Sequence, residues 1–221
     1  MLDNILDKRD IDPDKLQLVG VTSLWISSKV EEYYPAELSK LIHLTENSYK
    51  RHHIVQMEKI MLRILNFNVY FPEPMVFMLR FSRAALRSSD SVFLETCQYL
   101  IDSFIIHKEF SSTRPSLLAA GSVLAASHLY SAPVDAHTEA PPSCWTPTLV
   151  HYSGYSKAEV EPVALSMLRE VFKAATDEDY KYKGAHTKYK SQSQQNRLVL
   201  QPHLAPKVIS KARQHLGDSD F

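Results

Sequence analysis

Apolar residues recur along most of this chain at intervals of three and four positions, which is the period of a helix. The intervals are not the two-residue alternation of strands, and only five glycines interrupt them. The pattern predicts an all-α protein.

In the first half, the densest apolar pattern is KLQLVGVTSLWISSKVEE, at residues 15–32. A helix should begin at Pro13, since proline suits the first helical position and Asp12 can cap it. Apolar residues fall on nearly every side of this helix, which is typical of a helix buried among others. We expect it to be the central helix of a first lobe.

Two further helices should complete the first lobe. Pro35 opens a short one, PAELSKLIHL, and Thr45 or Asn47 caps a longer one, SYKRHHIVQMEKIMLRILNF. The run FNVYFPEP then breaks the period with two prolines and should link two lobes.

The second half repeats the plan. After an amphipathic segment, PMVFMLRFSRAAL, Asp90 should cap one helix and Pro115 should begin another, RPSLLAAGSVLAASHLY. The alanines of the latter allow close approach of neighbours, so we expect it to be the central helix of the second lobe. Ser156 and Glu159 form the capping box S-x-x-E of a last long helix that ends near Ala175.

The 221 residues therefore divide into three parts. We expect a first helical domain at residues 1–70, a second at residues 71–178 and a polar surface tail at residues 179–221. Two domains of about 100 residues each are an ordinary size for independent cores.

Charge narrows the class of partner. Lys and Arg together number 25, as do Asp and Glu, so the formal net charge is zero. A general nucleic-acid or membrane-surface binder would normally carry a basic excess. We expect neither kind of partner, whereas a protein partner fits.

Cysteine usage and the N-terminal residues favour an intracellular protein. Cys97 and Cys144 are the only cysteines and form no Cys-x-x-Cys pair, so reduced thiols are expected. MLDNILDKRDID lacks a signal-peptide pattern, and no apolar run is long enough to span a membrane. We expect the protein in the nucleus and the cytoplasm.

No motif indicates catalysis or a bound cofactor. There are ten histidines, but His52 and His53 are adjacent and no H-E-x-x-H or Cys/His quartet occurs. The glycines are too far apart for a phosphate loop, and no G-x-S-x-G elbow is present. We expect no metal, no cofactor, no catalytic residue and no enzyme activity, although an acid–base pair needs no sequence signature.

Two R-x-x-L tetrads, a short pattern also found in degradation signals, occur in the chain. Arg83–Leu86 lies in a predicted helix with its leucine toward the core, so we interpret it as structural. Arg197–Leu200 lies in the predicted tail and is a candidate degradation signal.

Several motifs, in the right order, resemble those of cyclin boxes. K-L-Q-L-V-G followed by S-K-x-E-E is the most characteristic, and the resemblance continues in YYPAEL, QMEKIMLRILNF and RPSLLAAGSVLAAS. FPEPMVFMLRFSR resembles the second box of B-type cyclins, fungal ones especially, and WTPTLVHYSGY is similar to a mitotic-cyclin pattern. The resemblance spans roughly residues 2–190. It implies tandem cyclin-box helical domains and a regulatory subunit that binds and activates a cyclin-dependent kinase at the G2/M transition.

The resemblance also implies a kinase-binding surface. In that family the first box holds a mobile kinase helix in its active position. By motif, the polar contacts fall on Lys29, in SSKVEE, and Glu58, in QMEKIM, which would otherwise be interpreted as solvated charges. The apolar contacts carry over to these positions: Ile26, Val30, Leu62, Phe67 and Val69. At Val30 the family more often has an aromatic residue, so this contact should be smaller.

The chain departs from the family at its start. LDNIL corresponds to the end of the second helix of the first box, so we expect the first helix to be missing. That helix forms one wall of the groove that docks R-x-L substrates, so Gln17 and Trp25 should be a remnant of the groove and docking should be impaired. The loop at residues 131–144 is also longer than is usual in the family.

A second hypothesis is a cyclin-box scaffold or transcription-type module that activates no kinase. General transcription factors of the B class use similar tandem boxes to bind DNA. Their DNA-binding face must be basic, whereas this chain is neutral. The kinase-activating hypothesis is therefore favoured.

Overall fold

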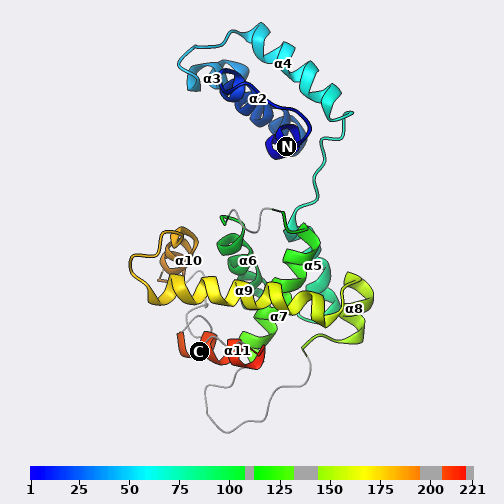
Figure 1. The fold of residues 1–221 in the computed structure, drawn as a ribbon, viewed down its shortest axis with the longest axis vertical. Helices are drawn as coiled ribbons and strands as arrows, with labels where there is room; N and C mark the ends of the chain where they lie inside the picture. The colour runs from blue at the N-terminus through cyan, green and yellow to red at the C-terminus, as the bar shows by residue number, and fades with distance from the viewer. Residues whose placement is uncertain (108–111, 132–143, 195–205, 218–221) are drawn as a thin grey trace. The chain divides into compact units, whose positions relative to one another are not determined.

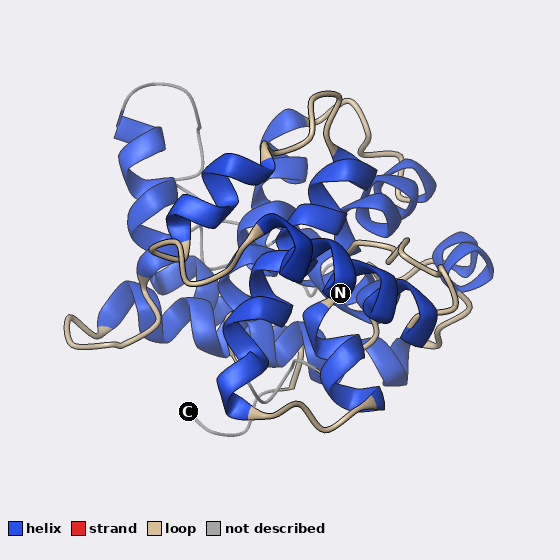
Figure 2. Cartoon of the chain, turned by 90° about the horizontal axis from the view of Figure 1, so that it is seen from above, coloured by secondary structure: helices blue, strands red, loops and turns tan. Residues whose placement is uncertain are grey.

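The structure is a computed structural model that describes residues 1–107, 112–131, 144–194 and 206–217. All regular elements in these ranges are α-helices, as Figures 1 and 2 show, and the prediction of an all-α protein is confirmed. The helices are α1 (Leu2–Lys8), α2 (Pro13–Glu31), α3 (Leu38–Leu44), α4 (Arg51–Ile64), α5 (Pro74–Ala84), α6 (Ser91–Phe104), α7 (Pro115–Ser131), α8 (Pro147–Ser153), α9 (Lys157–Thr176), α10 (Gly184–Gln194) and α11 (Pro206–His215).

The chain forms two compact units. Unit 1 is Met1–Phe71 and contains α1 to α4, and unit 2 is Pro72–Phe221 and contains α5 to α11. Each unit has its own apolar core.

In unit 1, α2 packs against α1, α3 and α4. It begins at Pro13 after the N-cap Asp12, as the sequence predicts. It is not enclosed, however, because Leu16 and Leu24 lie exposed on its outer face. Within the described residues only three helices cover α2, so one face of this apolar helix is left open.

The turn between α3 and α4 differs from the prediction. Thr45 ends α3 instead of capping α4, and its hydroxyl donates to the carbonyl of Ile42 at 2.8 Å. Glu46 and Asn47 follow in the left-handed region, with φ of 51° and 59°, which reverses the chain. Helix α4 therefore begins only at Arg51.

Unit 2 is built around α7, as predicted. This helix contacts α5, α6, α9 and α11 (Figure 1). Its alanines and all its leucines except Leu117 are buried, and Leu117 is partly buried against the core. At Gly121 an added Cβ would lie 2.7 Å from Cγ1 of Val163 in α9. The absence of a side chain at this position sets how closely the two helices approach.

The predicted caps of unit 2 are confirmed. Asp90 accepts from the backbone N–H of Phe93 at 3.0 Å at the start of α6. At the start of α9, both the backbone N–H and the hydroxyl of Ser156 donate to Glu159 Oε2, at 2.8 and 2.7 Å. These two hydrogen bonds lower the pKa of the Glu159 carboxyl below its ordinary value.

The C-terminal residues do not form the expected surface tail. Helices α10 and α11 pack on unit 2, where Tyr189, Ile209 and Ala212 are buried. Tyr189 also donates its hydroxyl proton to Asp102 of α6 at 2.8 Å. A few apolar side chains in a polar sequence are sufficient to attach these helices because α6, α7 and α9 provide a preformed apolar surface.

The structure describes only one of the two R-x-x-L tetrads, Arg83–Leu86. Leu86 follows α5 with φ of 58° and is 92% exposed, so the expectation that it faces the core is wrong. The chain leaves the helical path at this residue, and its side chain turns outward. Arg197–Leu200 lies outside the described residues, as does most of the loop at 131–144.

Helix α9 carries a partly buried carboxylate that links it to the segment after it. Tyr180 donates its hydroxyl proton to Glu170, Lys173 donates to it at 2.9 Å, and His107 Nε2 lies 3.5 Å away. Burial opposes ionisation of this carboxyl, but the three neighbours outweigh it and hold the pKa of Glu170 below its ordinary value.

The lowered pKa of Glu170 predicts acid sensitivity. A carboxyl whose folded pKa is depressed stabilises the fold above its unfolded pKa, about 4.3, and this contribution is lost as pH falls through the folded pKa. Glu170→Gln should therefore lower the melting temperature at about pH 7, and the difference from wild type should shrink below about pH 4. Thermal melting across this range checks it, with Glu161→Gln, in the surface pair with Lys157, as the control. A difference that does not change with pH would contradict this account.

Gly121 provides a second test. Alanine is favoured over glycine in a helix by roughly 1 kcal/mol, but forcing a methyl group against the stiff side chain of Val163 costs about 1–3 kcal/mol. Gly121→Ala should therefore destabilise unit 2 by roughly 1 kcal/mol, measured by chemical denaturation. In a Val163→Ala background the same change should be neutral or stabilising. Additive effects of the two changes would show that the contact does not limit the packing.

Candidate functional site

The two charged residues identified by motif lie together in unit 1. Lys29 is in the last turn of α2 and Glu58 is in the middle of α4, and their side chains form an ion pair. The Lys29 ammonium also lies over the indole ring of Trp25, 3.4 Å from its centroid. Trp25 is four residues before Lys29, so the two side chains share one face of α2.

The cluster of Trp25, Lys29 and Glu58 is partly shielded from water. The side chain of Lys29 is 35% exposed and that of Glu58 is 15% exposed. An ion pair open to solvent adds little stability by itself, and a cation over an indole ring at an exposed site contributes about 0.5–1 kcal/mol. These contacts hold the ammonium in one place more than they stabilise the unit.

The cluster retains capacity for further hydrogen bonds. An ammonium has three donors and a carboxylate has two acceptor oxygens. Within the described residues, Lys29 has one carboxylate partner, Oε1 of Glu58. Lys29 can therefore donate to a further acceptor, and Glu58 can accept from a further donor, while the ion pair persists.

Apolar side chains with open surface belong to the same two helices and the segment after them. Val30 is exposed at the end of α2, Phe67 is 70% exposed, and Leu62 and Val69 are half-buried against the core. Phe67 is held by backbone contacts: its N–H donates to Leu62 at 2.8 Å, and its carbonyl accepts from Val69 at 3.0 Å. With φ of 57°, Phe67 reverses the chain at the end of α4.

Ile26 is placed differently from the other predicted contacts. It is 3% exposed and packs in the core of unit 1 with Ile5, Val19, Met61 and Leu65. Its side chain lies on the part of α2 that packs in the core of unit 1. It supports the surface from below and does not form part of it.

Gln17 and Trp25, predicted as a groove remnant, lie about two helical turns apart on α2. Gln17 is exposed in the first half of α2, and eight residues of helix separate it from Trp25, about 12 Å along the axis. Trp25 instead supports Lys29. The four-residue spacing of the aromatic ring and the lysine was the signal that could have assigned this role from sequence.

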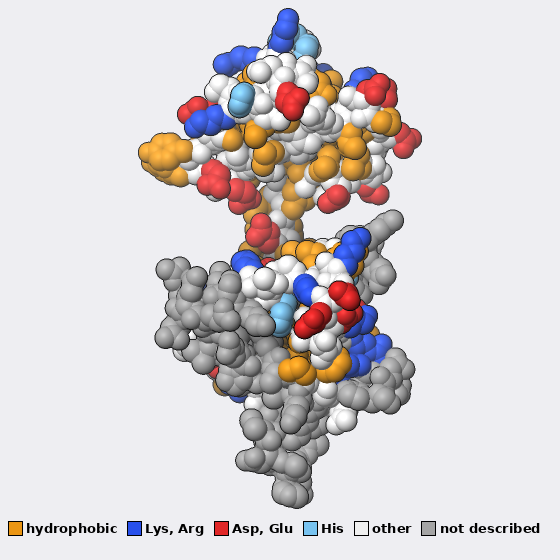
Figure 3. Space-filling model, turned by 90° about the vertical axis from the view of Figure 1, so that its left-hand side faces the viewer, with side chains coloured by type: hydrophobic (Ala, Val, Ile, Leu, Met, Phe, Trp, Pro, Cys, Tyr) orange, Lys and Arg blue, Asp and Glu red, His pale blue; other side chains and the backbone are white. Residues whose placement is uncertain are grey.

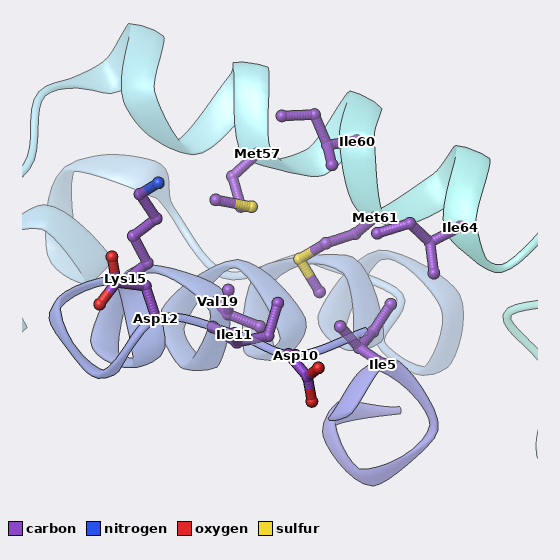
Figure 4. Close-up of a pocket in the computed structure, with 10 residues that line it drawn as sticks. All are labelled: Ile5, Asp10, Ile11, Asp12, Lys15, Val19, Met57, Ile60, Met61 and Ile64. Carbon is purple, nitrogen blue, oxygen red and sulfur yellow. The ribbon is translucent and has the colours of Figure 1, made fainter. Parts of the chain in front are cut away.

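A hollow of about 290 Å³ lies in unit 1 beside α4. Figure 4 shows apolar side chains of α4, among them Met57 and Met61, facing Val19 of α2 and Ile5 of α1. The charged lining residues are Asp10, Asp12 and Lys15, from the turn before α2 and its first residues. A hollow lined mainly by methionine and isoleucine is suited to apolar contact.

The described ranges contain neither a cluster of metal-ligating side chains nor a candidate membrane span. No three His, Cys, Asp or Glu side chains there are grouped to hold a metal ion. No helix among those residues is long and apolar enough to cross a membrane.

The described residues form an all-helical protein of two units. Unit 1 presents a paired cation and anion and exposed apolar side chains, a combination suited to contact with another protein.

Comparison with known families identifies the class of protein. Residues 1–70 match the cyclin N-terminal domain and residues 72–202 match the cyclin C-terminal domain. The chain therefore belongs to the cyclin family.

Three relatives show which cyclins this chain is similar to. It is 32% identical to the G2/mitotic-specific cyclin-B of Hydra vulgaris over 213 residues, which cover 96% of this chain and 54% of the relative. It is 35% identical over 205 residues to Cyclin-B1-5 of Oryza sativa subsp. japonica, covering 91% and 42%. It is 33% identical over 150 residues to the G2/mitotic-specific cyclin-B3 of Gallus gallus, covering 68% and 34%. The chain thus spans about half the length, or less, of these curated relatives.

The exposure of Phe67 predicts a contrast with its near neighbour Leu65. Phe67→Ala should change the free energy of unfolding by less than about 0.5 kcal/mol, because this side chain is mostly in water. Leu65→Ala should cost about 2–5 kcal/mol, because Leu65 is buried in the core. Chemical denaturation of the two variants checks this, and a large loss in Phe67→Ala would place that ring in the core.

Proposed function

We propose that this chain is a mitotic B-type cyclin, a regulatory subunit that binds a cyclin-dependent protein kinase and activates it at the G2/M transition. Membership of the cyclin family and similarity to proteins named G2/mitotic-specific cyclin-B support the proposal. As a regulatory subunit, it carries no catalytic residues of its own. It acts in the nucleus and the cytoplasm.

The kinase-binding surface consists of Lys29, Glu58, Val30, Leu62, Phe67 and Val69. A helix leaves carbonyl groups unpaired at its C-terminal end and N–H groups unpaired at its N-terminal end. Lys29 donates to backbone carbonyls of the kinase and Glu58 accepts from backbone N–H groups, while the apolar residues pack on the mobile helix. The cyclin binds only the active position of that helix tightly, so binding shifts the kinase toward activity.

One observation carries the proposal. Lys29 and Glu58 are 29 residues apart in sequence, and the structure brings them into contact on the surface of α2 and α4. Their contact, with Trp25 beneath the ammonium, presents a donor and an acceptor side by side.

The alternative, a scaffold or DNA-binding module, is less well supported. Lys29 is paired with an acid, so this surface has no net positive charge. Figure 3 shows one face of the protein, on which charges of both signs lie among hydrophobic side chains. Binding to phosphates would need a face with a basic excess.

Truncation of Lys29 tests the kinase-binding surface. Lys29→Ala should weaken binding to a cyclin-dependent kinase by about 2–5 kcal/mol, because a buried charged partner would be left unpaired in the complex. Calorimetry with the purified kinase and a histone-kinase assay measure affinity and activation. Lys157→Ala, in a comparable surface pair of unit 2, is the control and should bind normally.

Exchanging the two charges distinguishes a role of Lys29 and Glu58 in binding the kinase from a role in stabilising unit 1. Lys29→Glu combined with Glu58→Lys restores an ion pair within unit 1 but reverses the donor and the acceptor. If the kinase recognises the two groups, the swapped protein folds but fails to bind, and it melts slightly below wild type because the contact between the Lys29 ammonium and Trp25 is lost. Normal binding by the swapped protein would remove the proposed contact. Normal binding without activation would instead favour the scaffold hypothesis.

A further inference from the structure

A second hollow lies in unit 2, between α5 and α8. Its volume is about 390 Å³, and Arg80, Arg83, Leu86, Thr148 and Tyr152 line it together with Ala84. All the lining residues belong to one compact unit, so the hollow is part of its surface. Neither the family match nor the proposed kinase surface accounts for it.

The two arginines of this hollow lack acidic partners. Arg80 and Arg83 are one turn apart on α5, both are exposed, and neither forms an ion pair among the described residues. The next arginine along the chain is paired: Arg87 lies 3.3 Å from Asp90. A surface that leaves two neighbouring guanidinium groups uncompensated is complementary to anionic groups.

The hollow holds one of these cations in place. The Arg80 guanidinium lies over the ring of Tyr152, 5.3 Å from its centroid, which restricts its freedom while leaving its donors open. A planar guanidinium fork can bind a carboxylate through two parallel hydrogen bonds. The hydroxyls of Thr148 and Tyr152 add polar groups to the same wall.

Exposed apolar side chains lie on the same two helices and just after α5. Leu86 is 92% exposed and lines the hollow, Val76 and Leu79 are exposed on α5, and Val150 is exposed on α8. Arginine and apolar side chains together are typical of protein interfaces. A nucleic acid would need more positive charge than two arginines in a chain of zero net charge.

We propose that the hollow between α5 and α8 binds a short acidic and apolar peptide segment of another protein. Two carboxylates of the segment pair with Arg80 and Arg83, and an apolar residue between or beside them packs on Leu86. Two separate guanidinium groups on an open surface match two single charges better than one concentrated dianion. The site and the proposed kinase-binding surface share no residue.

An array of short peptides tests the proposal. Each peptide contains two glutamates and two leucines in a different order, and matched peptides carry glutamine, or one phosphoserine, in place of glutamate. The fluorescently labelled full chain is applied, and the affinity of the best acidic peptide is measured by fluorescence anisotropy. Replacing its glutamates by glutamine should weaken binding at least about tenfold, and added salt should weaken it further.

Substitutions in the hollow test whether the peptide binds there. Arg80→Gln with Arg83→Gln should weaken binding at least about tenfold, and Leu86→Ala should weaken it several-fold. The matched control, Arg51→Gln with Arg63→Gln, removes two exposed arginines of α4 and should bind the peptide as wild type does. Thermal melting confirms the fold of each variant. Perturbation of the Arg80 and Arg83 side-chain NMR signals by the peptide gives a second measurement on the unaltered chain.

Four results would overturn the proposal. These are absence of binding on the array, equal binding of the glutamine peptides, unchanged affinity in the double-arginine variant, and tighter binding of the phosphoserine peptide. A thymidine oligonucleotide whose binding is lost in the same variant would assign the site to nucleic acid. Self-association that disappears in that variant would assign it to a second copy of the chain.

Discussion

The packing of α2 on α4 is the contact on which the proposed kinase-binding surface depends. Val19 and Ile26 of α2 meet Met61 and Leu65 in one buried core, which fixes the distance between the two helices. Only at that distance does Lys29 reach Glu58. A substitution that leaves a cavity in this core would therefore loosen the surface without altering its charged groups.

The fold of unit 2 likewise depends on the packing of one helix against another, and here the two helices approach more closely. Helix α7 is covered by four helices, and Gly121 leaves no room for a Cβ against Val163. With α7 enclosed, α5 packs on its one side and α9 on its other, and the outer face of α5 is free to carry Arg80 and Arg83. In both units a buried apolar contact positions polar groups that contribute little to stability.

Helix starts were predictable because their causes are local. Pro13, Asp90 and Ser156 act through hydrogen bonds or backbone angles within a few residues, and all three begin helices as expected. The prediction that Thr45 caps α4 was wrong because a threonine hydroxyl can hydrogen-bond to the backbone at either end of a helix. The helix end at which Thr45 lies depends on the chain reversal at Glu46 and Asn47, and neither residue type requires a left-handed backbone.

The sequence alone determined the helical period and the all-α fold. Through its resemblance to cyclin boxes, it also identified Lys29 and Glu58 as candidate kinase contacts. Only the tertiary structure decided that these two residues meet, that Trp25 lies under the ammonium, and that Ile26 is buried. It also turned Leu86 outward and packed α10 and α11 on unit 2. The physical reason is the same in each case. A period or a cap is set by neighbours along the chain, whereas burial and pairing are set by side chains that only folding brings together.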